Sequence, residues 1–184
     1  MKVVAVNASP RSNGNCEVLV DQFLKGAKEA GCEVEKINLR NYKLSPCIGC
    51  EYCRTHNKEC IYKDDAPMLI ESIIDSDVFV LASPVYFGSL SAQMKIFIDR
   101  FFAKEYKIRD ADRTWQSYLL LTSGAPKIEF VQGAVMSYKG FIQVLRKVND
   151  RGIIDGCGAF NKGDAKSMDI YDHAYEMGKQ IVIK

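Results

Sequence analysis

The strongest constraint on this chain is a regular alternation of short apolar segments with segments of helical periodicity. Strand-like segments lie at residues 3–6, 33–39, 78–82, 118–122 and 153–160. Helical segments follow them at about residues 20–30, from Asp64 or Asp65 through Ile74, and at about 94–101, 131–148 and 167–182. Five such repeats predict an α/β fold, a three-layer doubly wound parallel sheet of strand order 2-1-3-4-5. In such sheets ligands bind outside the carboxyl ends of the strands, where the winding direction reverses.

The length and charge of the chain limit its organisation and its partners. A chain of 184 residues fits one domain, so we expect a single domain over residues 1–184 with a long cysteine-rich connection at about 40–62. The net charge of +2, with no run of Lys or Arg, gives no reason to expect nucleic acid or a membrane as partner. The apolar start is too short for a signal peptide, so we expect a cytoplasmic protein.

The loop after the first strand is dense in hydrogen-bond donors and opens a helix. A glycine that allows close backbone approach, an arginine and a helix N-terminus together describe a seat for a phosphate. An ordinary polar turn is the plainer alternative. The loop has neither the glycine pattern of dinucleotide sites nor a Gly-Lys-Ser/Thr phosphate loop. The predicted cofactor-binding residues here are Ser9, Arg11, Ser12, Asn13, Gly14, Asn15 and Cys16.

The loops after the third and fourth strands should lie beside this one, at the same edge of the sheet. The first of them is apolar and aromatic where polar turn residues are usual, which suits a flat hydrophobic ligand or a subunit contact. The second is small enough to contact the same ligand. The predicted binding residues are Pro84, Val85, Tyr86, Phe87, Gly88, Ser89, Thr122, Ser123 and Gly124.

Four of the seven cysteines fall within residues 47–60, and such clustering indicates a metal before a disulfide framework. Cys47, Cys50 and Cys53 are spaced three residues apart. The segment between Cys53 and Cys60 is long enough for Cys60 to bind the same group. This spacing suits one 4Fe-4S cluster. Zinc, a redox-active thiol pair or four reduced thiols without a metal are the alternatives.

These motifs resemble those of the NAD(P)H-dependent FMN reductases of the flavodoxin-like fold, and most closely those of the iron–sulfur flavoprotein branch. The resemblance rests on residues 7–15, on residues 83–89 and on the spacing of Lys95, Asp99 and Arg100. It implies that residues 9–16 bind the FMN phosphate, that residues 84–89 bind the flavin ring, and that residues 122–127 complete the site. Cys16 stands where that family usually has Ser or Thr. We expect Asp99 and Arg100 to form a structural or interface pair.

The resemblance also implies a function. It predicts an FMN-dependent oxidoreductase that takes electrons from NAD(P)H or reduced ferredoxin and passes them to a quinone, a flavin, an oxygen species or a protein acceptor. No catalytic side chain is predicted, because the flavin carries the chemistry. A homodimer or homotetramer is the expected assembly, with small-molecule or protein redox partners. The alternative is a flavodoxin-like electron carrier without a substrate of its own.

Overall fold

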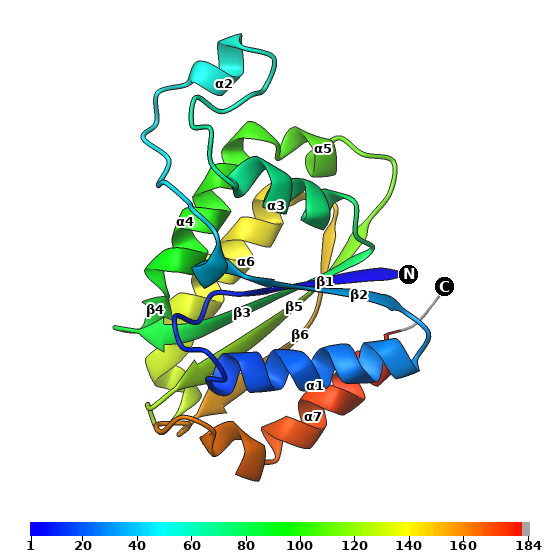
Figure 1. The fold of residues 1–184 in the computed structure, drawn as a ribbon, viewed down its shortest axis with the longest axis vertical. Coiled ribbons are helices and arrows are strands. Elements are labelled where there is room, and N and C mark those ends of the chain that lie inside the picture. The colour runs from blue at the N-terminus through cyan, green and yellow to red at the C-terminus, as the bar shows by residue number, and fades with distance from the viewer. Residues whose placement is uncertain (182–184) are drawn as a thin grey trace.

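The computed structural model describes residues 1–181, in which a central sheet is covered by helices on both faces (Figure 1). Its strands are β1 (Lys2–Asn7), β2 (Glu33–Asn38), β3 (Val78–Tyr86), β4 (Ser89–Leu90), β5 (Trp115–Ser123) and β6 (Val148–Cys157). The long strands pair in parallel in the order β2-β1-β3-β5-β6, and β4 pairs antiparallel with β3. Counting the long strands alone, this confirms the predicted order 2-1-3-4-5.

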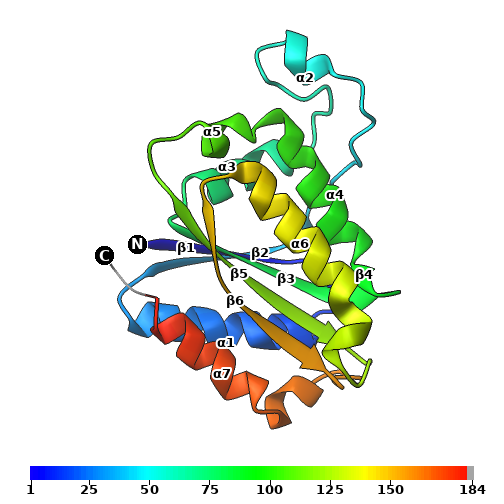
Figure 2. The same cartoon turned by 180° about the vertical axis from the view of Figure 1, so that it is seen from behind.

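The helices form the two outer layers. The α-helices are α1 (Asn15–Glu29), α2 (Tyr52–Thr55), α3 (Ala66–Ile74), α4 (Ala92–Arg100), α5 (Tyr106–Arg109), α6 (Gln132–Leu145) and α7 (Ile170–Lys179). Short 3₁₀ turns lie at Leu39–Asn41, Phe101–Ala103, Ile128–Val131 and Asp164–Ser167. Helices α1 and α7 cover one face of the sheet, and α3, α4 and α6 cover the other (Figures 1 and 2). The segment that carries α2 and the four clustered cysteines projects from the α3–α4 side (Figure 1).

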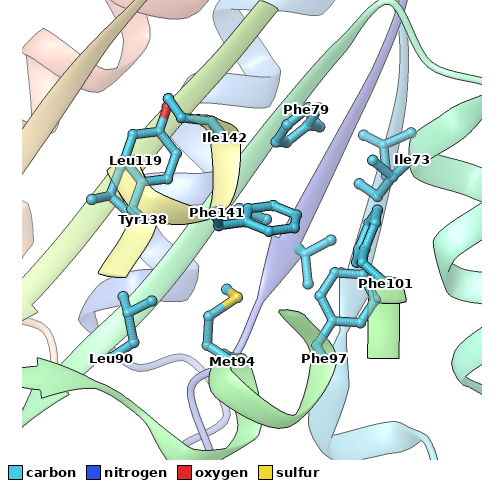
Figure 3. Packing of buried hydrophobic residues seen from close by; sticks show 14 of the residues in the cluster. Ile73, Phe79, Leu90, Met94, Phe97, Phe101, Leu119, Tyr138, Phe141 and Ile142 are labelled. Carbon is cyan, nitrogen blue, oxygen red and sulfur yellow. The ribbon is translucent and has the colours of Figure 1, made fainter. Parts of the chain in front are cut away.

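The continuous apolar segments of the sequence arise because the central strands are buried on both faces. In β1, Val4 and Val6 face the core beneath α3, α4 and α6, whereas Val3 and Ala5 face the core beneath α1 and α7. Figure 3 shows the first of these cores, where the rings of Phe101 and Phe141 meet edge to face at 5.0 Å. Such packing leaves the strand ends and their loops as the parts of the fold open to ligands.

Helices α1 and α7 touch backbone to backbone. A Cβ added at Gly26 of α1 would collide with the carbonyl of Tyr175, and one added at Gly178 of α7 would collide with the carbonyl of Phe23. Each helix therefore has a glycine where the other helix approaches, and this close contact fixes α7 against α1.

Several element ends differ from the prediction. The helix predicted at about 131–148 ends at Leu145, because Arg146 adopts a left-handed conformation with φ of 61°. The last strand was expected at 153–160, but it begins at Val148, which pairs with Trp115, and it ends at Cys157. The last helix begins after a 3₁₀ turn, and its predicted end at residue 182 lies outside the described residues.

The apolar loop predicted after the third strand is a tight hairpin. Strand β3 continues to Tyr86, and β4 returns at Ser89. Phe87 and Gly88 form the turn, with φ values of 50° and 76°. Two consecutive left-handed residues are what a two-residue hairpin turn requires.

Within residues 1–181, no helix combines the length and apolarity needed to cross a bilayer. The single-domain organisation over residues 1–184 and the cytoplasmic location stay predictions.

Candidate functional site

A cavity of about 270 Å³ opens at the carboxyl edge of the sheet, between the loops that follow β1, β3, β5 and β6. The predicted binding residues that line it are Ser9, Arg11, Gly14, Asn15, Pro84, Val85, Tyr86, Thr122, Ser123 and Gly124. The predicted residues that do not line it are Ser12, Asn13, Cys16, Phe87, Gly88 and Ser89. Ala159, Phe160 and Lys162 complete the lining, and the sequence analysis did not predict them.

Buried hydrogen bonds hold the first loop in shape. The Asn7 carboxamide accepts from the Ser9 N–H at 3.0 Å and donates to Asn38 on the neighbouring strand at 2.9 Å. The Ser9 hydroxyl in turn accepts from the Arg11 N–H at 3.2 Å. Gly14 is the N-cap of α1 and has no side chain to satisfy the N–H groups of the first turn. This end of the cavity therefore offers a cation, a hydroxyl and helix N–H groups to an anion.

Glu17 lies in the first turn of α1, where its negative charge would repel an anion. Two cations and a backbone N–H balance this charge. Its carboxylate accepts from the Asn13 N–H at 2.7 Å, from Arg40 at 3.1 Å and from Lys36 at 3.3 Å. Burial raises the pKa of Glu17, but these donors outweigh burial and hold the pKa below its usual range. Asn13 has a φ of 53°, a conformation that asparagine tolerates. Asn13 and Glu17 thus shape the loop from outside the cavity.

Cys16 stands where the resemblance leads one to expect Ser or Thr, and its surroundings account for this difference. The thiol is buried beneath α1 and lies 2.9 Å from the Thr122 hydroxyl. Burial raises its pKa to about 12, which keeps the thiol neutral. The side chain therefore links α1 to β5. Whether the Cys16 backbone contacts a phosphate stays a prediction.

The hairpin supplies one wall of the cavity. Pro84, Val85 and Tyr86 face it, and Tyr86 is about half exposed. A serine pair anchors the hairpin, since the Ser83 hydroxyl accepts from the Ser91 N–H at 3.0 Å. Phe87, at the tip, is fully exposed and does not line this cavity.

The opposite wall comes from the loop after β6, held in place by Asn15. The Asn15 amide donates to the carbonyls of Ala159 at 3.1 Å and Asn161 at 2.8 Å. Its oxygen accepts from the N–H groups of Gly163 at 2.8 Å and Ala165 at 3.3 Å. Asn15 was predicted to contact the cofactor, but all four bonds of its side chain go to the protein. Sequence spacing carried no signal for this wall, because its partners are main-chain groups about 150 residues away.

Replacement of Asn15 by leucine should reduce the free energy of unfolding by about 2–6 kcal/mol, since four hydrogen bonds of about 0.5–1.5 kcal/mol each are lost. Asn15→Asp keeps the two acceptor contacts and loses the two donor contacts, so it serves as the matched variant. Urea denaturation gives the stability, and amide hydrogen exchange of residues 158–165 reports on the wall. An Asn15→Leu protein with wild-type exchange in that segment would contradict the clamp.

The four clustered cysteines meet at a second place, at the base of the projecting loop. Cys47, Cys50, Cys53 and Cys60 line one small pocket together with Arg100 and the rings of Tyr62 and Phe102. All four are free thiols. Burial raises the pKa of the Cys53 thiol, and the charges of Cys60, Cys47 and Cys50 raise it further.

The thiols share a pocket without converging on a point. Among residues 1–181, no three His, Cys, Asp or Glu side chains are close enough to hold a single metal ion. A tetrahedral zinc site needs four sulfurs at about 2.3 Å from one ion. Within the described residues the structure therefore shows four thiols around one pocket and no formed metal site, so a cluster and zinc both stay predictions.

The ion pairing of Arg100, at the base of this loop, differs from the prediction. Arg100 was expected to pair with Asp99, but its guanidinium pairs with Asp64 at 2.6 Å, and Asp99 pairs with Lys95. Neighbouring residues on a helix point in different directions, so Asp99 and Arg100 do not face each other. Burial raises the pKa of Asp64, but bonds from Arg100 and from the N–H groups of Ser45 and Ala66 outweigh it and hold the pKa below its usual range.

Comparison with known proteins agrees with this geometry. Residues 1–125 match the model of the family described as NADPH-dependent FMN reductase. An iron–sulfur flavoprotein of Methanocaldococcus jannaschii is 42% identical over 100 residues, which cover 54% of this chain and 51% of that protein. The chain thus aligns with about half the length of the curated relatives it matches.

Solved structures share the fold. An NAD(P)H:quinone oxidoreductase from Methanothermobacter marburgensis superposes with a TM-score of 0.76 at 18% identity, over 100% of this chain and 97% of that one. An FMN-dependent NADH-azoreductase from Bacillus anthracis, solved in complex with FMN, superposes with a TM-score of 0.69 at 13% identity, over 99% of each chain. The sheet order and these neighbours confirm the flavodoxin-like fold, and the match over residues 1–125 shows that this chain belongs to the NADPH-dependent FMN reductase family.

Proposed function

We propose that this chain is an FMN-dependent oxidoreductase that takes electrons from NAD(P)H, or from reduced ferredoxin, and passes them to a quinone, a flavin, an oxygen species or a protein. The observation that carries the proposal is the cavity at the carboxyl edge of the sheet, which is cationic and rich in donors at one end and apolar along one wall. The family match supports flavin oxidoreductase activity.

The residues of the cavity fit FMN along its length. Ser9, Arg11 and the first turn of α1 would hold the phosphate, and Pro84, Val85 and Tyr86 would cover the ring. Thr122, Ser123 and Gly124 would bound the far edge of the ring, and Phe160 and Lys162 would form the outer wall. FMN bound there would supply hydride acceptance and electron release.

The protein groups around the cavity are suited to binding and orienting an anionic cofactor. The lining contains no carboxylate and no imidazole, and its ionisable groups are Arg11, Tyr86 and Lys162. Two cations favour an anionic cofactor and also the negative charge that a reduced flavin carries. This composition agrees with a reaction in which the side chains position the reactants.

We also propose that Cys47, Cys50, Cys53 and Cys60 hold one 4Fe-4S cluster. The support is the pocket that the four cysteines line together and their compact spacing in the sequence. A bound cluster would supply one-electron transfer. The four thiols would be its ligands, and the rings of Tyr62 and Phe102 would shield one side from water.

The cluster proposal predicts that Cys50→Ser removes most of the iron and sulfide and leaves FMN content at its wild-type level. The cysteine pocket and the flavin cavity share no residue, so loss of one group should spare the other. Absorption spectra with iron and sulfide assays after anaerobic purification measure this, and Cys32→Ser, a buried cysteine outside the group, is the control. Wild-type protein with flavin bands and no iron would remove the cluster and keep the flavin.

Steady-state oxidation of NADH and NADPH distinguishes the enzyme from an electron carrier. We expect turnover with a quinone, free FMN or oxygen as acceptor. Absence of turnover with either nucleotide, together with reduction by ferredoxin, would favour the carrier.

We further propose that a second copy of the chain covers the mouth of the cavity. The fully exposed Phe87 at the hairpin tip and the largely exposed Phe130 and Phe160 support this assembly. Light scattering of the FMN-loaded protein should give a dimer or a tetramer. A monomer at micromolar concentration would contradict it.

A further inference from the structure

One buried arginine closes the base of the cysteine-bearing loop. The Arg100 side chain, at the end of α4, is 2% exposed. It donates to the Ser45 carbonyl at 2.8 Å and to both carboxylate oxygens of Asp64, at 2.6 and 2.9 Å. Ser45 precedes the first cysteine of the group and Asp64 follows the last one, so a single guanidinium joins the two ends of the segment.

The two ends of this segment are also bonded to each other. The Ser45 N–H donates to Asp64 at 2.8 Å, and the Lys43 N–H donates to the side chain of Asp65 at 2.7 Å. The Asp65 N–H returns a bond to the Lys43 carbonyl at 3.1 Å. Arg100 thus completes a small polar network at the base of the loop.

Arg100 also faces the thiols. It lines the same pocket as Cys47, Cys50, Cys53 and Cys60, and it stacks over the Tyr62 ring at 5.3 Å. Burial would lower the pKa of Arg100, but the hydrogen bonds and charges of Asp64 and Cys60 outweigh burial and raise it. The guanidinium is therefore a positive charge in the pocket that the four thiols line.

We infer that Arg100 is a positioning residue for the four-thiol site. It holds the two ends of the cysteine segment together before any metal is present, and it sets one buried positive charge beside the ligand sulfurs. We call the bonds by which Arg100 joins the two ends of the cysteine segment the clasp. The redox consequence of the inference rests on the proposed cluster, whereas the clasp does not. A positive charge near thiolates favours the more negative, reduced state of a bound cluster and so raises its reduction potential.

Two functions of Arg100 can be separated by substitution. Arg100→Lys keeps the charge and loses the two-pronged bond to Asp64, because an ammonium cannot match the planar fork. Arg100→Met removes both the charge and the clasp. Asp64→Asn removes the partner charge while conserving volume. Lys95→Met, which removes an exposed cation one turn earlier on α4, is the matched control.

The first readout uses the iron-free full chain with FMN bound. We expect the two partly buried thiols, Cys53 and Cys60, to react with Ellman's reagent about tenfold faster or more in Arg100→Met, Arg100→Lys and Asp64→Asn, because a loosened loop exposes them. Cys47 and Cys50 are already exposed and should react at the wild-type rate. Lys95→Met should react at the wild-type rate. Equal rates in all variants would overturn the clasp.

The second readout uses anaerobically reconstituted protein. We expect iron and sulfide per chain to fall in Arg100→Met, and the midpoint potential of the cluster that remains, followed by electron paramagnetic resonance, to move to more negative values. Arg100→Lys should keep a potential close to wild type, and the same potential in Arg100→Met would overturn the electrostatic part. If wild-type protein takes up no iron, the proposed cluster fails, while the thiol reactivity still decides the clasp. If Arg100→Met does not fold, the thiol reactivity of the other two variants decides the clasp. Asp64→Asn, which removes a negative charge beside Arg100, should then move the potential to more positive values, and an unchanged potential would overturn the electrostatic part.

Discussion

Replacing Gly14 by valine should weaken FMN binding by about 10–100-fold, which corresponds to the loss of one or two hydrogen bonds to a charged phosphate. A Cβ at this position would already lie 3.2 Å from the Arg11 Cβ and carbonyl and 3.3 Å from the Ser9 hydroxyl. The two methyl groups of valine would therefore push Ser9 and Arg11 out of place. Fluorescence titration of the flavin-free protein with FMN measures the affinity.

Riboflavin provides the control ligand, because it has the ring of FMN without the phosphate. We expect Gly14→Val to change riboflavin affinity much less than FMN affinity. Gly140→Ala is the control variant, since a Cβ there meets nothing within 4 Å. Equal losses for both flavins would show that the phosphate does not lie at Gly14.

Replacing Gly178 by valine should reduce the free energy of unfolding by about 3 kcal/mol or more, because the new side chain collides with a backbone that cannot turn aside. The clash is with the carbonyl of Phe23, so α7 must leave α1 or both helices must distort. For a protein of this size, such a loss lowers Tm by roughly 6–12 °C. Thermal and urea unfolding followed by circular dichroism measure it.

Gly140→Val is the matched control for this change. It places the same side chain in a helix, at a position with open space around it. It should not reduce the free energy of unfolding, since only helix propensity changes and valine is a better helix former than glycine. The same Tm in the two variants would contradict close helix contact at Gly178.

The central strands and their order could be predicted because burial on both faces leaves a plain signal in the sequence. Val3–Val6 and Val78–Ala82 are uninterrupted apolar segments, and both are fully buried. Once these strands are parallel, their carboxyl ends must share an edge, so the loops at Ser9, Pro84 and Thr122 had to meet. The cavity confirms that they do.

The hairpin and the outer wall were not predicted, for different reasons. Phenylalanine is an unfavourable residue for the left-handed conformation that Phe87 adopts, so the sequence did not resemble a hairpin turn. Phe160 reaches the cavity through bonds between Asn15 and main-chain carbonyls, and main-chain groups leave no residue pattern to detect.

The pairing of Arg100 shows the same difficulty. A side chain that bonds to residues 36 and 55 positions away cannot be assigned from its immediate neighbours. The adjacent Asp99 was the attractive partner on charge alone. Helix geometry rather than charge decides the pairing, because consecutive residues point about 100° apart around the axis.

The Asn15 clamp has a consequence for how members of such a family can diverge. The family match ends at residue 125, yet the segment beyond it is bonded to the first residue of α1. Those bonds reach only main-chain atoms, so the side chains at Phe160 and Lys162 can change freely while the clamp holds. A graft of the carboxyl-terminal third from one relative onto another would then exchange the outer wall of the cavity and keep the hydrogen bonds that join this wall to Asn15.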